Sequence, residues 1–518
     1  MHRLKQLLPP MFLFALSLLV VLPVAPHFQP LPLNDSSVFL YIGNQMTQGA
    51  VPYRDIWDHK GPLIYFIQFL GLSFADGSRW GVWLLEFLFL FFAAWIGYSF
   101  MSRCFGRWSA LFGVLAFLLH LPAVLDGGNL IEEYALFFQF AFLLTLERGF
   151  SSGRRHYFYL AGLASACLFL LRPNTTALPL AAGILLLGLY YRSREPKLGK
   201  YLSSIFAGGM SLLIVVFLYF AINQAFPQML DAVLRFNFIY SHATVLEQAN
   251  VMRAALNYLS IFAILAIAGW ILGLYVLTQR RFSKFPFLLA LLITAFPLEI
   301  AFSSLSGRLY LHYYMSLLPV GASLIAFFVF RAGTLNLQTY ESRNSNSPKI
   351  LSISLLVGLL LYFGWSFHYP VQKTIEEIEI YGFPRVTFTG SSTLPTLQYL
   401  QTYIAADKPL LVWGNNLRLN WISGRPAPTR FVYQVALFEP NYVTPEIVQE
   451  IVDALAAHPD TVIIDTTLEE DTQFLSLGKD VADIPVVLQP LYTYIKTNYS
   501  AASQMEQTSW QLYLPIEK

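Results

Sequence analysis

The residues best suited to chemistry lie in a segment of about fifty residues between the first two strongly apolar stretches. Asp35 precedes an apolar run, and the segment continues as Tyr53-Arg54-Asp55-Ile56-Trp57-Asp58-His59-Lys60-Gly61-Pro62. A connection between neighbouring helices needs far fewer residues, and long loops of this kind are usually functional. The run after Asp35 predicts a helix along the membrane surface, where Asp35 either caps the helix N-terminus or takes part in catalysis.

Adjacent carboxylates mark a second candidate position, Glu132 and Glu133, shortly after Asp126-Gly127-Gly128-Asn129. Two carboxylates at the mouth of a membrane span are costly when buried, and acids there often mark function. They suit the solvated first turn of a helix equally well. Such acids can bind a divalent cation or orient the acceptor group of a substrate. Mg²⁺ or Mn²⁺ is compatible, with Asp35 and Glu132 as ligands, although no spacing demands a metal.

Basic residues form the third group of candidates. Arg308 and His312 lie in a segment with Tyr310, Tyr313 and Tyr314, which the sequence explains as aromatic residues of the membrane interface. Arg308 and His312 are candidates for binding a phosphate group. Arg172, at a turn inside an apolar hairpin, is a further candidate, with a side chain that snorkels to water as the alternative.

Composition shows which elements must position these residues. Apolar residues make up 56% of the 518 residues and charged residues only 12%, whereas a soluble domain carries roughly 25% charged residues. Hydrophobic stretches of about 17 to 22 residues match helices that cross roughly 30 Å of hydrocarbon. They predict about eleven spans, near 8–25, 80–101, 108–125, 134–147, 157–172, 175–191, 202–222, 257–277, 286–302, 314–330 and 350–366.

Lys and Arg collect in every second loop, which predicts that these loops and the N-terminus are cytoplasmic. The first apolar stretch is expected to remain as a helix rather than to be cleaved as a signal peptide. The intervening loops are then extracytoplasmic, and they hold Asp35, Asp55, Asp58, Asp126, Glu132, Glu133, Asp231 and Glu247. The basic residues form no concentrated face, which argues against nucleic acid as a partner.

The chain changes character after residue 366. Residues 1–366 are expected to form the transmembrane part, with a long first outer loop at 26–79, and residues 367–518 a soluble extracytoplasmic α/β domain. Residues 408–414 and 461–465 predict buried strands, with a helix over 445–457 that Thr444 caps. Residues 510–514 predict an edge strand. Trp413, Asn415, Trp421 and Arg425 form an aromatic and polar group that could stack on a sugar, although packing within the domain explains them more readily.

The first outer loop resembles that of polytopic glycosyltransferases of the GT-C superfamily, in the branch of the protein O-mannosyltransferases and the lipid A aminoarabinose transferase. Those enzymes place an acid just after the first helix, in a long outer loop with surface helices, and a Lys-Pro-Pro-like motif before the second span. Asp35 and Lys60-Gly61-Pro62 match this layout. Two positions depart from it, because Ser36 stands where the family often has a second acid and Gly61 replaces the first proline.

The resemblance implies a GT-C-like α-helical membrane enzyme that moves a sugar from a polyprenyl-phosphate donor to an acceptor hydroxyl. The reaction would take place on the outer, periplasmic face of a bacterial inner membrane. A carboxylate must then deprotonate an alcohol, and cations must stabilise a phosphate leaving group. The implied catalytic residues are Asp35, Glu132 and Glu133, and the implied substrate-binding residues are Asp55, Asp58, His59, Lys60, Arg172, Arg308 and His312. A lipid, a glycan and a protein all remain open as the acceptor.

Two other functions compete with transfer. A transporter or flippase of a lipid-linked substrate usually shows internal repeats and ionisable groups at mid-membrane depth. A scaffold would leave the long first loop and its acids unexplained. The predicted grouping of Asp35, Lys60, Glu132 and Arg308 at one membrane face favours the transferase, because a transporter needs access from both faces.

Overall fold

The computed structural model describes residues 2–241, 243–279, 286–341, 370–380, 395–467, 474–502 and 510–516, together with residues 364, 368 and 382. The chain forms two compact units. Unit 1 comprises Met1–Phe28, Trp83–Val216 and Ala243–Arg385, and unit 2 comprises Gln29–Val82, Phe217–His242 and Val386–Lys518. Each unit is therefore assembled from segments that are far apart in the sequence.

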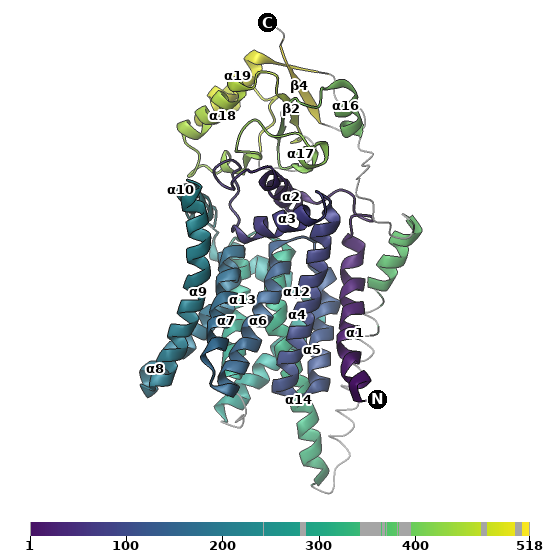
Figure 1. Ribbon diagram of the computed structural model, residues 1–518, viewed down its shortest axis with the longest axis vertical. Helices are drawn as coiled ribbons and strands as arrows, with labels where there is room; N and C mark the ends of the chain where they lie inside the picture. Colours follow the sequence, from purple (N-terminus) through teal and green to yellow (C-terminus); the bar gives the residue numbers. More distant parts are fainter. Residues whose placement is uncertain are drawn as a thin grey trace. The chain divides into compact units, whose positions relative to one another are not determined.

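Unit 1 is a helical bundle, in which α4, α5, α6, α7, α12 and α13 run alongside one another (Figure 1). Its helices are α1 (His2–Val21), η1 (Leu22–Val24), α4 (Arg79–Phe105), α5 (Arg107–His120), η2 (Leu121–Ala123), α6 (Ile131–Ser152), α7 (Arg155–Leu171), η3 (Pro173–Thr176), α8 (Ala177–Ser193), α9 (Pro196–Ile222), α12 (Val245–Thr278), α13 (Pro286–Ser304), η5 (Leu311–Ser316) and α14 (Leu317–Glu341). The first residues of α4 and the last of α9 belong to unit 2.

Six helical segments in the described part of the chain are long and apolar enough to cross a membrane. They are Arg79–Phe105, Pro173–Ser193, Pro196–Ile222, Val245–Thr278, Pro286–Ser304 and Leu311–Gly333. Shorter apolar helices occupy Leu8–Val24, Leu63–Phe74, Arg107–Ala123 and Arg155–Leu171. The chain is thus an integral membrane protein, while the count of about eleven spans stays a prediction. Apart from residue 364, the span expected at 350–366 lies outside the described residues.

Burial separates lipid-facing helices from central ones within unit 1. The apolar window of α9 has a mean hydropathy of 2.5 and is only 11% buried, so most of its apolar surface is left for lipid. The corresponding window of α14 is 83% buried. Small residues allow close packing where α7 meets α9, because a Cβ atom on Gly162 would lie 2.0 Å from the carbonyl oxygen of Ile205.

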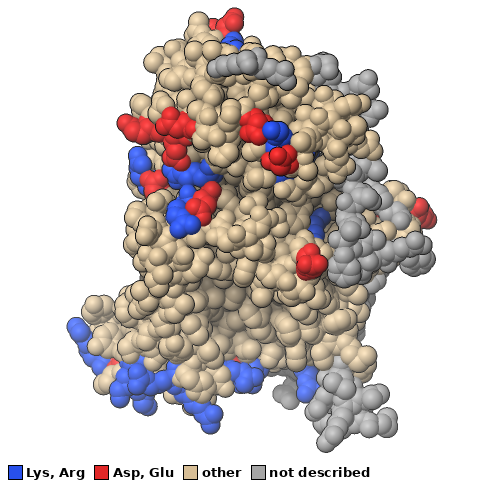
Figure 2. All heavy atoms as spheres, turned by 45° about the horizontal axis from the view of Figure 1, so that its top comes forward, with Lys and Arg blue, Asp and Glu red and all other residues tan. Residues whose placement is uncertain are grey.

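Exposed basic residues lie where α6 gives way to α7 and where α8 gives way to α9. They are Arg154, Arg155, Arg192, Arg194, Lys197 and Lys200. Figure 2 shows Lys and Arg side chains gathered along its lower edge. This is the grouping from which the sequence predicts the cytoplasmic side.

Unit 2 joins the first loop to the C-terminal part of the chain. The loop contributes α2 (Asn34–Thr47) and α3 (Leu63–Phe74), which pack against each other. Residues after α9 form α10 (Phe226–Leu230), the π-helix η4 (Asp231–Phe236) and α11 (Asn237–Tyr240). The C-terminal part contributes α16 (Pro395–Tyr403), β1 (Leu410–Trp413), α17 (Arg418–Ser423), η6 (Gln434–Ala436), α18 (Pro445–Ala457), β2 (Val462–Asp465), η7 (Val481–Asp483), η8 (Val486–Leu488), α19 (Gln489–Asn498), β3 (Tyr499–Ala501) and β4 (Gln511–Pro515).

The four strands form one sheet in the order β1-β2-β4-β3. β1 and β2 are parallel, with Leu410 opposite Val462, and the pairs of β4 with β2 and with β3 are antiparallel. The predicted strands at 408–414 and 461–465 are confirmed, as is the helix that Thr444 caps. The expectation of an edge strand at 510–514 is wrong, because β3 pairs with the far side of β4.

Candidate functional site

The turn at the start of the Tyr53–Pro62 run is closed by its own residues. Tyr53 has a φ of 69°, and its N–H donates to the carbonyl oxygen of Ile56 at 2.7 Å. One carboxylate oxygen of Asp55 accepts the Val51 N–H at 2.8 Å, and Arg54 pairs with the same carboxylate. Asp55 therefore shapes the turn, in the way that Asp side chains commonly do.

Asp58 is buried at the centre of unit 2, and both of its carboxylate oxygens accept hydrogen bonds. Tyr65 of α3 donates to one oxygen at 2.7 Å. Tyr433, which lies just before η6, donates to the other oxygen, and so does the His59 N–H at 2.6 Å. Burial opposes ionisation of this carboxyl, but the hydrogen bond and charge of His59 and the charge of Lys60 outweigh it. They lower the pKa of Asp58 to about 2, so the group is ionised at neutral pH.

His59 follows Asp58 and is held from two other segments of unit 2. Its Nδ1 lies 3.2 Å from the Tyr433 hydroxyl, and its carbonyl oxygen accepts from Asn237 of α11 at 2.6 Å. Burial and the neighbouring charge of Lys60 lower the pKa of His59, although the Asp58 carboxylate acts in the opposite direction. His59 is therefore neutral at pH 7, where it contributes ring contacts and hydrogen bonds, and its positive charge acts on Asp58 only at the low pH where that carboxyl titrates.

Lys60 and Asp35 form an ion pair within unit 2. The Lys60 Nζ lies 3.5 Å from Asp35 Oδ2, and the side chains are 11% and 37% exposed. The Lys60 carbonyl oxygen accepts a hydrogen bond from the Tyr53 hydroxyl at 2.7 Å, which fixes the backbone at this point. The pair thus combines a solvent-accessible carboxylate with a largely buried ammonium group on a braced backbone.

Asp35 lies in the first turn of α2, as the sequence predicts, but it does not cap that helix. The residue at the cap position is Leu33, which makes no side-chain capping hydrogen bond. The interpretation of Asp35 as a helix cap is therefore wrong. Its carboxylate still benefits from the positive end of the helix dipole.

In unit 1, Arg172 is enclosed by Glu132 and Tyr313. It follows the last residue of α7, donates to a carboxylate oxygen of Glu132 on α6, and lies 3.6 Å above the ring centre of Tyr313 in η5. The Arg172 side chain is only 15% exposed, so the snorkelling alternative is wrong. Glu132 is 3% exposed and its neighbour Glu133 is fully buried beside Glu86 of α4.

The expected interface tyrosines behave differently from one another. Tyr313 is 6% exposed and Tyr314 is fully buried, so the interface explanation is wrong for both. Tyr313 forms a face for the Arg172 guanidinium, and the Tyr314 hydroxyl lies 2.7 Å from Ser304 Oγ. Tyr310 remains 38% exposed. Polar partners for the ring or the hydroxyl therefore decide which tyrosine is buried.

His312 pairs with Asp126, an acid that the sequence did not single out as a site residue. His312 Nδ1 lies 3.1 Å from Asp126 Oδ2, and the Asp126 side chain is 57% exposed. Arg308 is half-buried in the segment just before η5. The sequence singled out this segment through its basic residues, and the structure adds a carboxylate that pairs with His312.

The loop that carries Asp126 has an unusual backbone. Four consecutive residues, Asp126 to Asn129, have φ values between 45° and 83°. Two glycines adopt this conformation at little cost, but Asp126 and Asn129 are strained by it. The Asn129 N–H donates to Glu86 at 2.9 Å, and the Asn129 side chain accepts from the Tyr134 hydroxyl at 2.8 Å. The Gly-Gly pair in the sequence was the available signal for this loop.

The C-terminal candidates for sugar stacking serve packing instead. Trp413 is fully buried, with its indole N–H donating to the Leu475 carbonyl oxygen at 2.8 Å. Arg425 is 3% exposed and donates to the carbonyl oxygens of Leu400, Ile404, Ala405 and Lys408. These contacts satisfy the C-terminal end of α16 and the turn that follows it.

The carboxylates expected to bind a divalent cation already have cationic partners. Asp35 pairs with Lys60 in unit 2, and Glu132 pairs with Arg172 in unit 1. Within the described residues, no three His, Cys, Asp or Glu side chains are grouped in a way that could hold a metal ion. Mg²⁺ or Mn²⁺ would have to compete with Lys60 or Arg172, so these residues do not fit a metal site as they stand.

A model of one protein family, the putative competence-induced protein Ccs4 N-terminal domain, matches residues 2–378. The chain belongs to this family. The match includes the whole first loop and both basic segments of unit 1, at Arg172 and at Arg308. No curated protein sequence matches this chain.

Solved structures identify the fold of this family member. ArnT from Cupriavidus metallidurans bound to undecaprenyl phosphate matches with a TM-score of 0.61 and 12% identity, over 97% of this chain and 97% of that chain. The apo state of the same protein matches with a TM-score of 0.55 and 15% identity, over 96% and 97%. ArnT is a GT-C glycosyltransferase, so the resemblance to the GT-C superfamily is confirmed at the level of the fold.

Proposed function

We propose that the protein is a membrane glycosyltransferase that moves a sugar from a polyprenyl-phosphate donor to an acceptor hydroxyl. The observation that carries this proposal is the Asp35–Lys60 pair, at 3.5 Å, in a GT-C fold. A carboxylate that is accessible to solvent and an ammonium group that is held in place are what such a transfer requires. ArnT, one of the matching structures, was solved with undecaprenyl phosphate, which supports a carrier of this class.

In the proposed reaction, Asp35 is the general base. The acceptor hydroxyl gives its proton to the Asp35 carboxylate while its oxygen forms a bond to the anomeric carbon of the sugar. The bond from that carbon to the carrier phosphate breaks, and the phosphate oxygen takes the electron pair. Lys60 contacts this phosphate and stabilises the charge that develops on the leaving oxygen.

The buried residues of the same run have a positioning role in this proposal. Asp58 is 1% exposed, and its carboxylate accepts hydrogen bonds from Tyr65, Tyr433 and the His59 N–H. These bonds fix the backbone that presents Lys60. His59 adds contacts to the same backbone, and Asp55 closes the turn before it. We assign these three residues to holding the substrate-binding run in shape.

Unit 1 contributes further candidates for the donor. Arg172, Arg308 and His312 are proposed to bind the donor phosphate or the sugar, because guanidinium and imidazole groups are suited to both. Glu132 orients Arg172, and Glu133, buried beside Glu86, supports the start of α6 rather than the reacting atoms. No step runs through a metal ion. Catalysis is proposed for the extracytoplasmic face of a bacterial inner membrane, where the first loop lies in the predicted topology.

The test is sugar transfer by the purified protein in nanodiscs, with a panel of undecaprenyl-phosphate sugars. Asp35→Asn should lower turnover by at least about a hundredfold, since it removes the base. Asp76→Asn is the matched control, because Asp76 is an exposed acid elsewhere in the same loop. Transfer that survives in Asp35→Asn would remove Asp35 from the mechanism. Donor-independent movement of a labelled lipid across sealed proteoliposomes would favour the flippase instead.

A further inference from the structure

A pocket of about 360 Å³ opens on the side of unit 1 that carries Asp126. Its walls come from the end of α1 and η1, from η2 and the Asp126 loop, from the segment before and at the start of η5, and from the helical residues 370–380. All of these belong to unit 1. The lining residues are Val20, Pro23, Val24, Pro122, Ala123, Leu125, Asp126, Gly127, Leu309, Tyr310, Leu311 and Lys373.

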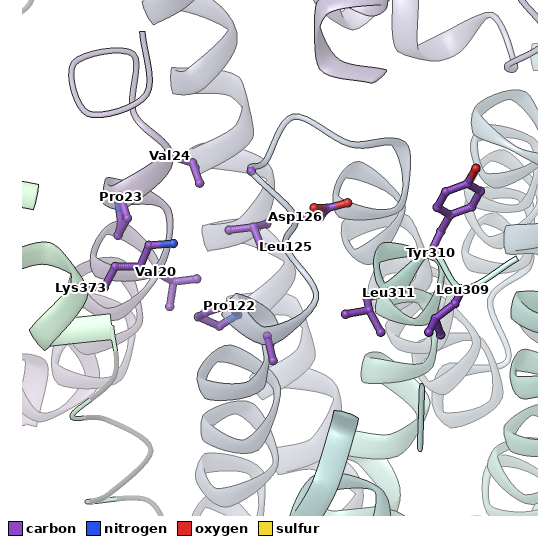
Figure 3. Close-up of a pocket in the computed structure, with 12 residues that line it drawn as sticks. Val20, Pro23, Val24, Pro122, Leu125, Asp126, Leu309, Tyr310, Leu311 and Lys373 are labelled. Atoms are coloured by element: carbon purple, nitrogen blue, oxygen red, sulfur yellow. The ribbon is translucent and has the colours of Figure 1, made fainter. Parts of the chain in front are cut away.

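The lining is divided between apolar surface and a few polar groups at the ends. Val20, Leu125 and Leu311 contribute hydrocarbon walls, while the charged groups are Asp126 and Lys373. In Figure 3 the Lys373 ammonium group points into the pocket from one side, and Asp126 stands on the other side toward Tyr310. Pockets of this kind bind ligands that are mostly apolar and are oriented by a few polar contacts.

The charges of the two ends are not equivalent. Asp126 is paired with His312 at 3.1 Å. Lys373 forms no salt bridge with any residue that the structure describes, and its ammonium group points into the pocket (Figure 3). An anionic group is attracted to the Lys373 end and repelled from the Asp126 end. A hydroxyl group suits Asp126, because a carboxylate accepts hydrogen bonds.

We propose that this pocket binds an anionic lipid with a hydroxyl-bearing head group. The lipid phosphate lies at Lys373, a head-group hydroxyl donates to Asp126, and the glycerol and upper acyl carbons contact the apolar wall. A lipid is chosen over a free anion because eight of the twelve lining residues are Val, Leu, Pro or Ala and the pocket lies beside the end of α1, an apolar helix. The binding site does not rest on the proposed function.

Lipid binding can be measured without any turnover. The detergent-purified protein is titrated with dioleoyl phosphatidylglycerol, with dioleoyl phosphatidylcholine or with inorganic phosphate, and bound lipid is counted by native mass spectrometry. Phosphatidylglycerol should bind more tightly than phosphatidylcholine, and Lys373→Gln should lower the phosphatidylglycerol affinity about fivefold, as expected for one partly exposed charge pair. Lys373→Arg should retain the preference. Lys479→Gln, which removes an exposed lysine from the C-terminal part of unit 2, should change nothing.

A second variant tests the apolar wall. Ala123 lines the pocket but is exposed, so Ala123→Trp fills the space without removing a buried contact. The Ala123→Trp variant should bind both lipids more weakly than the wild type does. Equal binding of the two lipids, or an unchanged preference for phosphatidylglycerol in Lys373→Gln, would overturn the site. Displacement of phosphatidylglycerol by inorganic phosphate at the same concentration would overturn the choice of a lipid.

Discussion

Replacing Asp58 by Asn should destabilise unit 2 and disturb the position of Lys60 at the same time. The pKa of Asp58 falls from its ordinary value of 3.8 to about 2 on folding. Each pKa unit corresponds to about 1.4 kcal/mol, so the ionised carboxylate contributes about 2 kcal/mol. Because the folded-state pKa is depressed, this contribution is fully present above pH 4 and is lost as the pH falls through about 2. Asp58 is 1% exposed, so solvent screening does not reduce it.

The assay is thermal unfolding of the purified protein in detergent, followed at pH 7 at one scan rate. A loss of about 2 kcal/mol should lower the apparent midpoint by about 4 °C. Asp76→Asn, at an exposed position of the same loop, should stay within about 1 °C of the wild type. Two results would refute the reasoning: Asp58→Asn melting at the wild-type temperature, or a stability difference from the wild type that does not shrink between pH 4 and pH 2.

Three further predictions concern the buried polar groups and the carboxylates that are paired with cations. Arg172→Gln should cost about 3 kcal/mol, since it leaves Glu132 buried without its cation, and the Arg172→Gln/Glu132→Gln double variant should recover most of that loss in the same melting assay. Glu299→Gln keeps an acceptor for the Leu178 N–H and Gln139, each at 3.1 Å, so its cost should be under about 1 kcal/mol, whereas Glu299→Leu should cost about 2 to 4 kcal/mol. Excess EDTA should change sugar transfer by less than about twofold, because Lys60 and Arg172 occupy the carboxylates that a metal would need, and a loss restored by Mg²⁺ or Mn²⁺ would contradict that assignment.

The elements of the fold could be predicted wherever a long pattern repeats. Apolar stretches of membrane length gave most of the helices of unit 1, because a helix in lipid must satisfy its backbone internally and bury few charges. The helix after Asp35 and the parallel pair of β1 and β2 were also within reach, through an apolar run and through short runs with turn signals at their ends. The strand order could not be predicted, because the second neighbour of β4 is β3, a strand of three residues with little pattern of its own.

The contacts of the candidate site were beyond the sequence for a different reason. Asp58 and Tyr433 are 375 residues apart, and His312 and Asp126 are 186 residues apart. Residue types at such separations carry no information about which of them meet. Asp55 and Asp58 look equivalent in the sequence, yet one closes an exposed turn and the other is buried among hydroxyl groups. Only the packing of α3 and of the segment around Tyr433 decides between these roles.

The candidate acids and cations share one arrangement, which bears on how transfer would be controlled. Asp35 pairs with Lys60, Glu132 with Arg172 and Asp126 with His312, each pair within one unit. A donor phosphate that binds Lys60 must therefore draw the ammonium group away from a carboxylate that is already its partner. A carboxylate that loses its cation binds a proton more tightly, and a general base needs that property. In the proposed mechanism, donor binding thus prepares Asp35 to accept the proton, so that the base becomes effective only when the sugar is in place.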